Sequence, residues 1–289
     1  MRTALRVNGR DFAASVGVSH RMLVKWETGE TQTIRAANQA ALDTILATAD
    51  RTVQERFAEQ ITKDAAAQRD VRTEQLLRRE GQYTKSPTDG KLMVTVEAGI
   101  FLSGPQGKPT WVEAFLIDVH PTTNADYAQF VRATGRRAPK HWPQGKCPDS
   151  IFDHPVVWVT WHDAMAYTVW AGKALPTGHQ WEKAARGAKG SVYPWGDEPT
   201  AAKCNVLDSG MGRTTPVSRY QSGVSPYGVF DMCGNTWEWC ATETDPGRHE
   251  LKGSAYTSPF TRAAPSLMND ANATMSDNDT GFRCVSVSS

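Results

Sequence analysis

The sequence has no long apolar run and no leader-like start. Nowhere in its 289 residues does an apolar stretch approach the roughly 18 residues that a membrane-spanning helix requires. The opening residues, MRTALRVNGRDFAAS, lack the apolar core of a secretory signal peptide. We therefore expect no membrane partner and no secretion, and we predict a cytoplasmic protein.

Cysteine is also scarce. The five cysteines are Cys147, Cys204, Cys233, Cys240 and Cys284. Their odd number and irregular spacing do not form a disulfide framework, and the lack of a CxxC pair argues against a zinc site. Reduced thiols, as in a cytoplasmic protein, are the simplest interpretation.

Neither sign of charge predominates over the whole chain. The sequence holds 32 Lys and Arg against 31 Asp and Glu, for a formal net charge of +1. With 39% hydrophobic and 22% charged residues, it has the composition of a soluble globular protein. The first 40 residues carry six Lys or Arg against three Asp or Glu. This excess of three fits either an anionic partner or an ordinary solvated surface.

Tryptophan is nearly absent from the first 100 residues, where only Trp26 occurs, whereas nine tryptophans lie between Trp111 and Trp239. This division predicts two domains, and we expect the tryptophans to form the core of the second one. The expected parts are a helical domain over residues 1–48, a connecting helix over 49–80, a linker over 81–90 and a loop-rich domain over 91–289.

The connecting segment is a charged run with a narrow apolar stripe. Apolar side chains recur every four residues at Val53, Phe57, Ile61 and Ala65. Such a stripe packs either on the first domain or against another copy of the chain. A homo-oligomer formed through this helix is therefore one expectation.

Residues 10–30, RDFAASVGVSHRMLVKWETGE, have the spacing of a helix-turn-helix. A small residue, Ala13, stands where the two helices would cross, and Gly17 stands in the turn, where a positive φ costs little. Such units place the start of the second helix in the major groove of DNA. The expected DNA-binding residues are Ser19, which also caps that helix, His20, Arg21 and Lys25.

This segment resembles the helix-turn-helix domains of phage-repressor type, and the resemblance implies DNA binding. A helical adaptor that does not bind DNA is the alternative interpretation. A single unit of this kind usually dimerises for tight DNA binding, and the 49–80 helix could supply the contact.

Several blocks of the second domain resemble, in the same order, those of the formylglycine-generating enzymes, or sulfatase-modifying factors. They include HPVVWVTWHDAMAYTVWAGKALPTGHQWEKAARG at 154–187, YGVFDMCGNTWEWC at 227–240 and TGFRCV at 280–285. The resemblance runs from about residue 92 to 285. It implies an α+β chain, with a variant C-type-lectin fold following the N-terminal all-α helix-turn-helix domain.

The same resemblance bears on activity. The family's oxidases convert a substrate cysteine to an aldehyde and bind copper(I) through two cysteines after an RGGSW-like strand. The matching strand here is LKGSAY at 251–256, and the following TSPFTRAA at 257–264 holds no cysteine. Because soft thiolates suit copper(I) and hydroxyls do not, we expect no copper and no formylglycine formation.

The family's signature loop also implies structural calcium. The ligands of a first site would be the Asp231 and Glu238 carboxylates with the Gly234 and Thr236 carbonyls, since calcium prefers hard oxygen ligands. A second, poorer match would use Asn205 and the Val206 carbonyl. Alternatively, the two carboxylates cap turns or pair with arginines.

Three functions from different classes follow. The first is a non-catalytic recognition module, linked to DNA or a partner by the helix-turn-helix. The second is a variable protein of a diversity-generating retroelement, which uses this fold and varies a stretch before a terminal GFR, here residues 255–280. The third is a metal-dependent oxidase with a changed active site.

The first two hypotheses share a surface for a protein or peptide ligand at the C-terminal end of the domain. Its expected contact residues are Tyr256, Thr257, Ser258, Phe260, Arg262, Asn269, Asn272 and Asn278.

Overall fold

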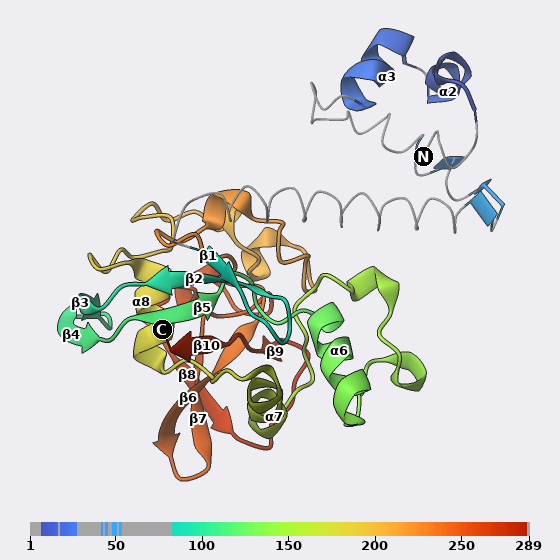
Figure 1. Cartoon of the computed structure of the whole chain (residues 1–289). Helices are drawn as coiled ribbons and strands as arrows, with labels where there is room; N and C mark the ends of the chain where they lie inside the picture. The colour runs from blue at the N-terminus through green and yellow to red at the C-terminus, as the bar shows by residue number, and fades with distance from the viewer. Residues whose placement is uncertain are drawn as a thin grey trace. The chain divides into compact units, whose positions relative to one another are not determined.

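A computed structural model describes residues 7–16, 18–27, 42, 44–45, 48–50, 52–53 and 83–287. The chain divides into two compact units, Met1–Gln75 and Leu76–Ser289 (Figure 1). Gly17 and most of the expected connecting helix, including Phe57, Ile61 and Ala65, lie outside the described residues.

The described part of the first unit includes the short helices α2 (Gly9–Val16) and α3 (His20–Glu27). The amide of Val18 donates to the Ala13 carbonyl at 2.9 Å, which closes the turn that follows α2. As predicted, Ser19 caps α3, because its hydroxyl accepts from the Met22 amide at 3.2 Å. The buried face consists of Phe12, Ala13, Val16 and Leu23.

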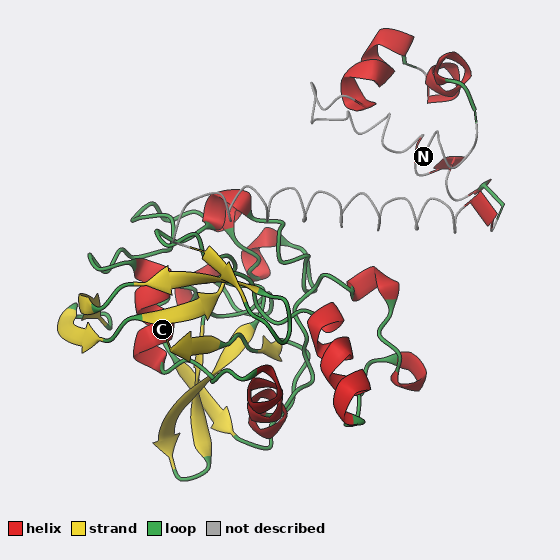
Figure 2. Ribbon diagram, in the orientation of Figure 1, coloured by secondary structure: helices red, strands yellow, loops and turns green. Residues whose placement is uncertain are grey.

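Three antiparallel or mixed sheets build the second unit (Figure 2). The first has the order β1 (Tyr83–Lys85), β2 (Leu92–Val96), β5 (Phe115–Asp118) and β10 (Val285–Val287). The second is the hairpin of β3 (Gly99–Ser103) and β4 (Lys108–Val112). The third has the order β8 (Asn269–Asn272), β7 (Arg248–Lys252), β6 (Trp237–Asp245) and β9 (Thr280–Gly281), with β6 and β9 parallel.

Three α-helices pack around these sheets: α6 (Asn124–Thr134), α7 (Trp161–Ala171) and α8 (Gly178–Arg186). Each begins at a threonine in a capping box, in which the threonine and the third helical residue satisfy each other's backbone amides. Short 3-10 helices occupy Pro143–Gly145, Asp149–Ile151, Ala201–Lys203, Leu207–Ser209, Gln221–Gly223 and Phe260–Arg262.

The described part of the segment expected as a linker, residues 83–90, has regular structure. Residues 83–85 form β1 and pair with β2. The chain then turns back, and the Ser86 amide donates to the Lys91 carbonyl at 2.9 Å. Asp89, in this turn, is buried. These residues therefore belong to the second unit. Their short, exposed strand has too few alternating positions for a sequence pattern to reveal it.

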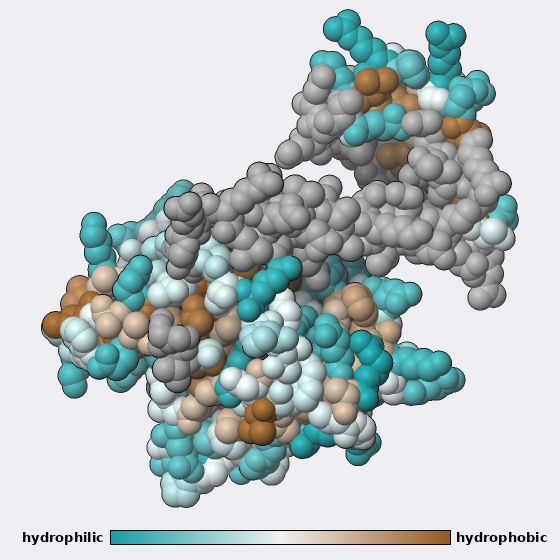
Figure 3. Space-filling view, in the orientation of Figure 1, coloured by the Kyte–Doolittle hydropathy of each residue, from teal (hydrophilic) through white to brown (hydrophobic). Residues whose placement is uncertain are grey.

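The core of the second unit is aromatic. Trp142, Trp181, Trp237 and Trp239 are buried, as predicted, but Trp111 is 57% exposed on β4. It stands opposite Ile100 across the β3–β4 hairpin, and both side chains are exposed. Hydrophobic residues, in brown, are visible over this hairpin at the left of the second unit (Figure 3). No described helix is long and apolar enough to cross a membrane.

Candidate functional site

The signature loop at 227–240 is held by one buried asparagine. The Asn235 side-chain oxygen accepts from the Asn205 amide group at 3.1 Å and from the Thr215 backbone amide at 2.9 Å. Its nitrogen donates to the Thr215 carbonyl at 3.1 Å and to the Asp231 carboxylate at 2.8 Å. Every bonding position of the amide is thus used, which fixes the loop against residues 205–215.

Two backbone segments meet closely at Gly234. It pairs with Asn205 in an isolated parallel bridge, and its φ is 80°. A Cβ atom at this position would lie 2.4 Å from the Asn205 carbonyl oxygen. Only glycine therefore suits both the left-handed backbone and the contact.

The Glu238 carboxylate forms a buried pair with Arg283. Nε and Nη2 of the arginine each lie 2.7 Å from one carboxylate oxygen, and the Trp181 indole also donates at 2.7 Å. Glu238 is 1% exposed and Arg283 is 0% exposed. The arrangement favours the alternative interpretation of Glu238, in which it pairs with an arginine.

Asp231 differs from Glu238 because no cation pairs with it at close range. Burial raises the pKa of Asp231 to about 7, and the hydrogen bond from Asn235 only partly offsets this. The Gly234 carbonyl accepts from the Thr236 amide at 3.0 Å. Among the described residues, no cluster of three His, Cys, Asp or Glu side chains could hold a metal ion. Calcium at the first site stays a prediction.

Ser209 forms hydrogen bonds to the oxygen atoms that were expected to bind calcium at the second site. The Val206 carbonyl accepts from both its amide, at 3.0 Å, and its hydroxyl, at 2.7 Å. That hydroxyl also lies 3.1 Å from the Asn205 side-chain oxygen. With its acceptors used in this way, the site fits calcium poorly.

The eight predicted ligand-contact residues divide into two groups. Tyr256 is only 9% exposed, and Phe260 is half-buried because it stacks on Tyr193 with 5.1 Å between the ring centres. The rings of these two residues pack mainly inside the domain, and their contact with a ligand stays a prediction. We call the others the C-terminal face: Thr257, Ser258, Arg262, Asn269, Asn272 and Asn278, which are exposed or half-buried.

Two segments of the C-terminal face are tied together. The Thr257 hydroxyl donates to the Asp279 carboxylate, which joins the turn after β7 to the turn before β9. Asn272 accepts from both the amide and the hydroxyl of Thr274. The face thus consists of five small polar side chains and Arg262, with the Thr257–Asp279 hydrogen bond joining two of its segments.

A pocket of about 210 Å³ adjoins this face. Its lining includes Tyr127, Arg137, Lys140, Trp158, Asp163 and Ser276. Trp158 has a φ of 61°, which is unusual for a bulky residue, and its amide donates to the Asp277 carbonyl at 2.8 Å. No sequence pattern indicated this pocket, because its residues come from four separate segments.

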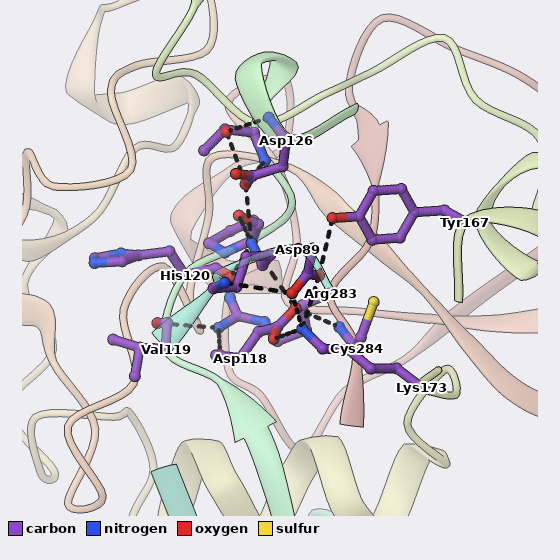
Figure 4. Close-up of polar contacts among 12 residues, drawn as sticks. Asp89, Asp118, Val119, His120, Asp126, Tyr167, Lys173, Arg283 and Cys284 are labelled. Carbon is purple, nitrogen blue, oxygen red and sulfur yellow. Dashed lines mark hydrogen bonds and ion pairs between the residues drawn. The ribbon is translucent and has the colours of Figure 1, made fainter. Parts of the chain in front are cut away.

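A buried network of ion pairs includes Asp89, Asp118, Asp126 and Lys173 (Figure 4). Lys173 lies 2.8 Å from both Asp89 and Asp118, and Lys91 lies 3.1 Å from Asp126. Burial raises the pKa of Asp118. At Asp89 burial also acts to raise the pKa, but the charge and hydrogen bond of Lys173, together with Ser86 and Lys91, outweigh it, so that the pKa is lowered. Side-chain exposures of 0–2% for Lys173, Asp89 and Asp118 leave no access for a substrate, so these residues hold the fold together.

The sulfatase-modifying factor enzyme 1-like domain matches residues 79–287. This chain belongs to that family. The formylglycine-generating enzyme of Thermomonospora curvata is 31% identical over 248 residues, covering 63% of this chain and 80% of the enzyme. The inactive Cα-formylglycine-generating enzyme 2 of Bos taurus is 30% identical, with coverages of 63% and 80%.

A third relative, the uncharacterized protein YfmG of Bacillus subtilis, is 34% identical over 273 residues. The match covers 71% of this chain and 55% of YfmG, so this chain spans about half the length of that relative.

Solved structures confirm the fold of the family member. PvdO from Pseudomonas aeruginosa has a TM-score of 0.60 at 22% identity, covering 71% of this chain and 97% of PvdO. Treponema denticola variable protein 1 has a TM-score of 0.57 at 17% identity, with coverages of 71% and 98%. The second unit therefore has the formylglycine-generating-enzyme and C-type-lectin-like fold, as predicted.

Proposed function

We propose that the second unit is a non-catalytic recognition module that binds a protein or peptide ligand at the C-terminal face. The observation that supports this proposal is the face itself, where polar side chains that are exposed or half-buried lie on two segments joined by the Thr257–Asp279 hydrogen bond. Such a surface changes its chemistry by substitution while the core stays unaltered.

The positions and the raised pKa values of the cysteines support the proposal that the module is non-catalytic. The resembled oxidases bind copper(I) through two cysteine thiolates, and none of the five cysteines here lies in residues 257–264. Burial raises the pKa of Cys233, Cys240 and Cys284 well above the usual value, and it raises that of Cys147 to about 11. The family also includes an inactive member in Bos taurus.

The retroelement hypothesis is a narrower form of the same proposal. Treponema denticola variable protein 1 shares the fold, which is compatible with a diversified surface here. A near-copy of the codons for residues 255–280 beside a reverse-transcriptase gene is the expected genomic sign. If that copy is absent, the recognition module stands without the retroelement.

For the first unit we propose DNA or partner binding in a cytoplasmic protein. Ser19, His20 and Arg21 are exposed around the start of α3, and Lys25 is half-buried one turn later. An Arg21→Ala variant should weaken DNA binding at low salt in a gel-shift assay. Binding that persists unchanged in this variant contradicts the proposed contact.

Selection of ligands from a displayed peptide library, with the full chain as bait, tests the main proposal. Replacement of Asn278 or Asn269 by arginine should weaken a selected ligand at least about tenfold, since a bulky cation displaces close contacts. Lys108→Ala, on the exposed end of β4, is the matched control and should leave binding unchanged. One equivalent of bound copper or iron together with oxidation of a cysteine peptide would instead establish the oxidase alternative.

A further inference from the structure

The pocket beside the C-terminal face is lined by hydrogen-bond donors that have no acceptor. Within the described residues, no acceptor lies within hydrogen-bonding reach of the Arg137 guanidinium or of the hydroxyls of Tyr127 and Ser276. The Lys140 ammonium contacts only the Trp158 ring, 3.5 Å from its centre. Tyr127 is only 1% exposed as a whole, and its side chain lines the pocket.

The single acidic lining residue, Asp163, cannot satisfy these donors. One of its oxygens accepts from the amide and the hydroxyl of Thr160, at 3.1 and 2.6 Å, as part of the α7 capping box. The other faces Arg136 at 3.5 Å. Since the acceptor in the wall is already used, the pocket presents donors and positive charge to whatever enters it.

The backbone at Trp158 connects the pocket to the C-terminal face. Its left-handed conformation costs free energy in a bulky residue and persists because the surroundings hold it. The Trp158 amide donates to the carbonyl of Asp277, one residue from Ser276 in the pocket wall and one from Asn278 in the face. A ligand on the face can therefore reach the pocket without leaving the surface.

We propose that this pocket binds the carboxylate side chain of a glutamate or aspartate in the peptide or protein ligand. The Lys140 ammonium and the Arg137 guanidinium supply charge-assisted hydrogen bonds. The Tyr127 and Ser276 hydroxyls donate further bonds, and the Trp158 ring packs on the methylenes. A volume of about 210 Å³ holds one side chain of this size with its carboxylate. The inference rests on the proposed function and names the chemistry of its anchor residue.

Nuclear magnetic resonance of the full chain tests the proposal with two tripeptides, acetyl-Gly-Glu-Gly-amide and acetyl-Gly-Gln-Gly-amide, and with inorganic phosphate. The reporter is the indole signal of Trp158, assigned from the Trp158→Phe variant. We expect the glutamate peptide to shift this signal saturably and the isosteric glutamine peptide to bind at least about tenfold more weakly, because unpaired donors favour an anion.

Matched variants place the binding in the pocket. Lys140→Met should weaken the glutamate peptide about tenfold or more, whereas Lys146→Met, which removes an exposed lysine outside the pocket lining, should not. Tyr127→Phe should reduce affinity several-fold with the indole spectrum otherwise preserved. Equal binding of the glutamine peptide, or an unchanged affinity in Lys140→Met, overturns the proposal. Phosphate that competes more strongly than the glutamate peptide also overturns it and identifies an inorganic-oxyanion site.

Failure of this inference is distinguishable from failure of the proposed function. If selected ligands bind the face without an acidic residue and ignore Lys140→Met, the recognition module stands and the acidic anchor is wrong. If the glutamate peptide binds but no ligand depends on Asn269 or Asn278, the pocket stands and the recognition face is wrong.

Discussion

Arg283 connects three parts of the domain through one side chain. Besides its pair with Glu238, its Nη2 donates to the Phe230 carbonyl at 2.8 Å and its Nη1 to the Asp118 carbonyl at 3.2 Å. A guanidinium has five donors in a fixed plane, which suits a position where several acceptors converge. The arginine thus joins the signature loop, at Phe230 and Glu238, to the end of β5, at Asp118.

Gly234 offers a sharp test of backbone geometry. Gly234→Ala should lower the free energy of unfolding by about 2–4 kcal/mol, because its Cβ atom meets the Asn205 carbonyl and the backbone is left-handed. Gly247→Ala is the matched control, since Gly247 has a φ of 72° but no atom within 4 Å of the added carbon. It should cost only about 1 kcal/mol. Chemical denaturation measures both, and equal costs would contradict the close contact.

Asp231 predicts a pH dependence of stability. The pKa of Asp231 is about 7 in the folded state, against an ordinary value of about 3.9. Between about pH 4 and about pH 7 the carboxyl is therefore protonated in the folded chain and ionised in the unfolded chain. Stability should therefore fall as pH rises from about 4 to about 7, by on the order of 4 kcal/mol from this group. Denaturation curves at several pH values should show the fall in the native chain and not in Asp231→Asn.

Added calcium tests the predicted calcium site at Asp231 with the same two proteins. A cation at the signature loop would lower the pKa of Asp231, and calcium added at pH 7 should then stabilise the native chain but not Asp231→Asn. If calcium leaves both proteins unchanged, the predicted calcium site is absent while the pH prediction still stands.

Among the elements, helix α7 has local start and stop signals in the sequence, whereas the first strand has none. Helix α7 begins at Trp161 after the Thr160 cap and ends at Gly172, whose left-handed conformation only glycine adopts freely. Those signals are local, so the sequence contains them. The strand β1 is only three residues long and exists through pairing with β2, a partner that local patterns do not identify.

Truncation tests the place of β1. A chain that begins at residue 91 loses β1 and Asp89, so Lys173 keeps only Asp118, which it shares with Lys91. We expect it to be less stable than a chain beginning at residue 76 by about 3 kcal/mol or more, because a buried charge loses its partner. Thermal melting of the two proteins measures the difference, and equal melting temperatures would show that residues 83–90 are a linker after all.

Over the whole molecule, the family and the fold followed from ordered sequence blocks, whereas the pocket did not. Its lining joins Tyr127 on α6, Lys140 after that helix, Trp158 before α7 and Ser276 after β8. These positions are far apart in the chain, and although Trp158 lies in the 154–187 block, no motif links the four. Their meeting is a product of tertiary packing, which one sequence alone does not reveal.

Thiol reactivity reports the packing of the whole domain. Cys204, Cys233, Cys240 and Cys284 are buried and Cys147 is half-buried, with all five unpaired. We expect a thiol reagent to modify at most one cysteine in the native protein, and slowly, because the thiolate is the reactive form. In denaturant all five should react. Fewer than five would indicate a disulfide and contradict the expectation of reduced thiols.

The ion pair of Glu238 with Arg283 is expected to form late in folding. The two residues are 45 positions apart, and Cys284 donates its amide to Asp118 across 166 positions. Contacts of such high sequence separation form slowly, because a long loop must close before they contribute. During synthesis, Glu238 emerges well before Arg283, so the nascent domain holds this carboxylate without its cationic partner until the final strand arrives. The domain is thus expected to complete its fold late, and the segment that carries the recognition face is made before its closing strand.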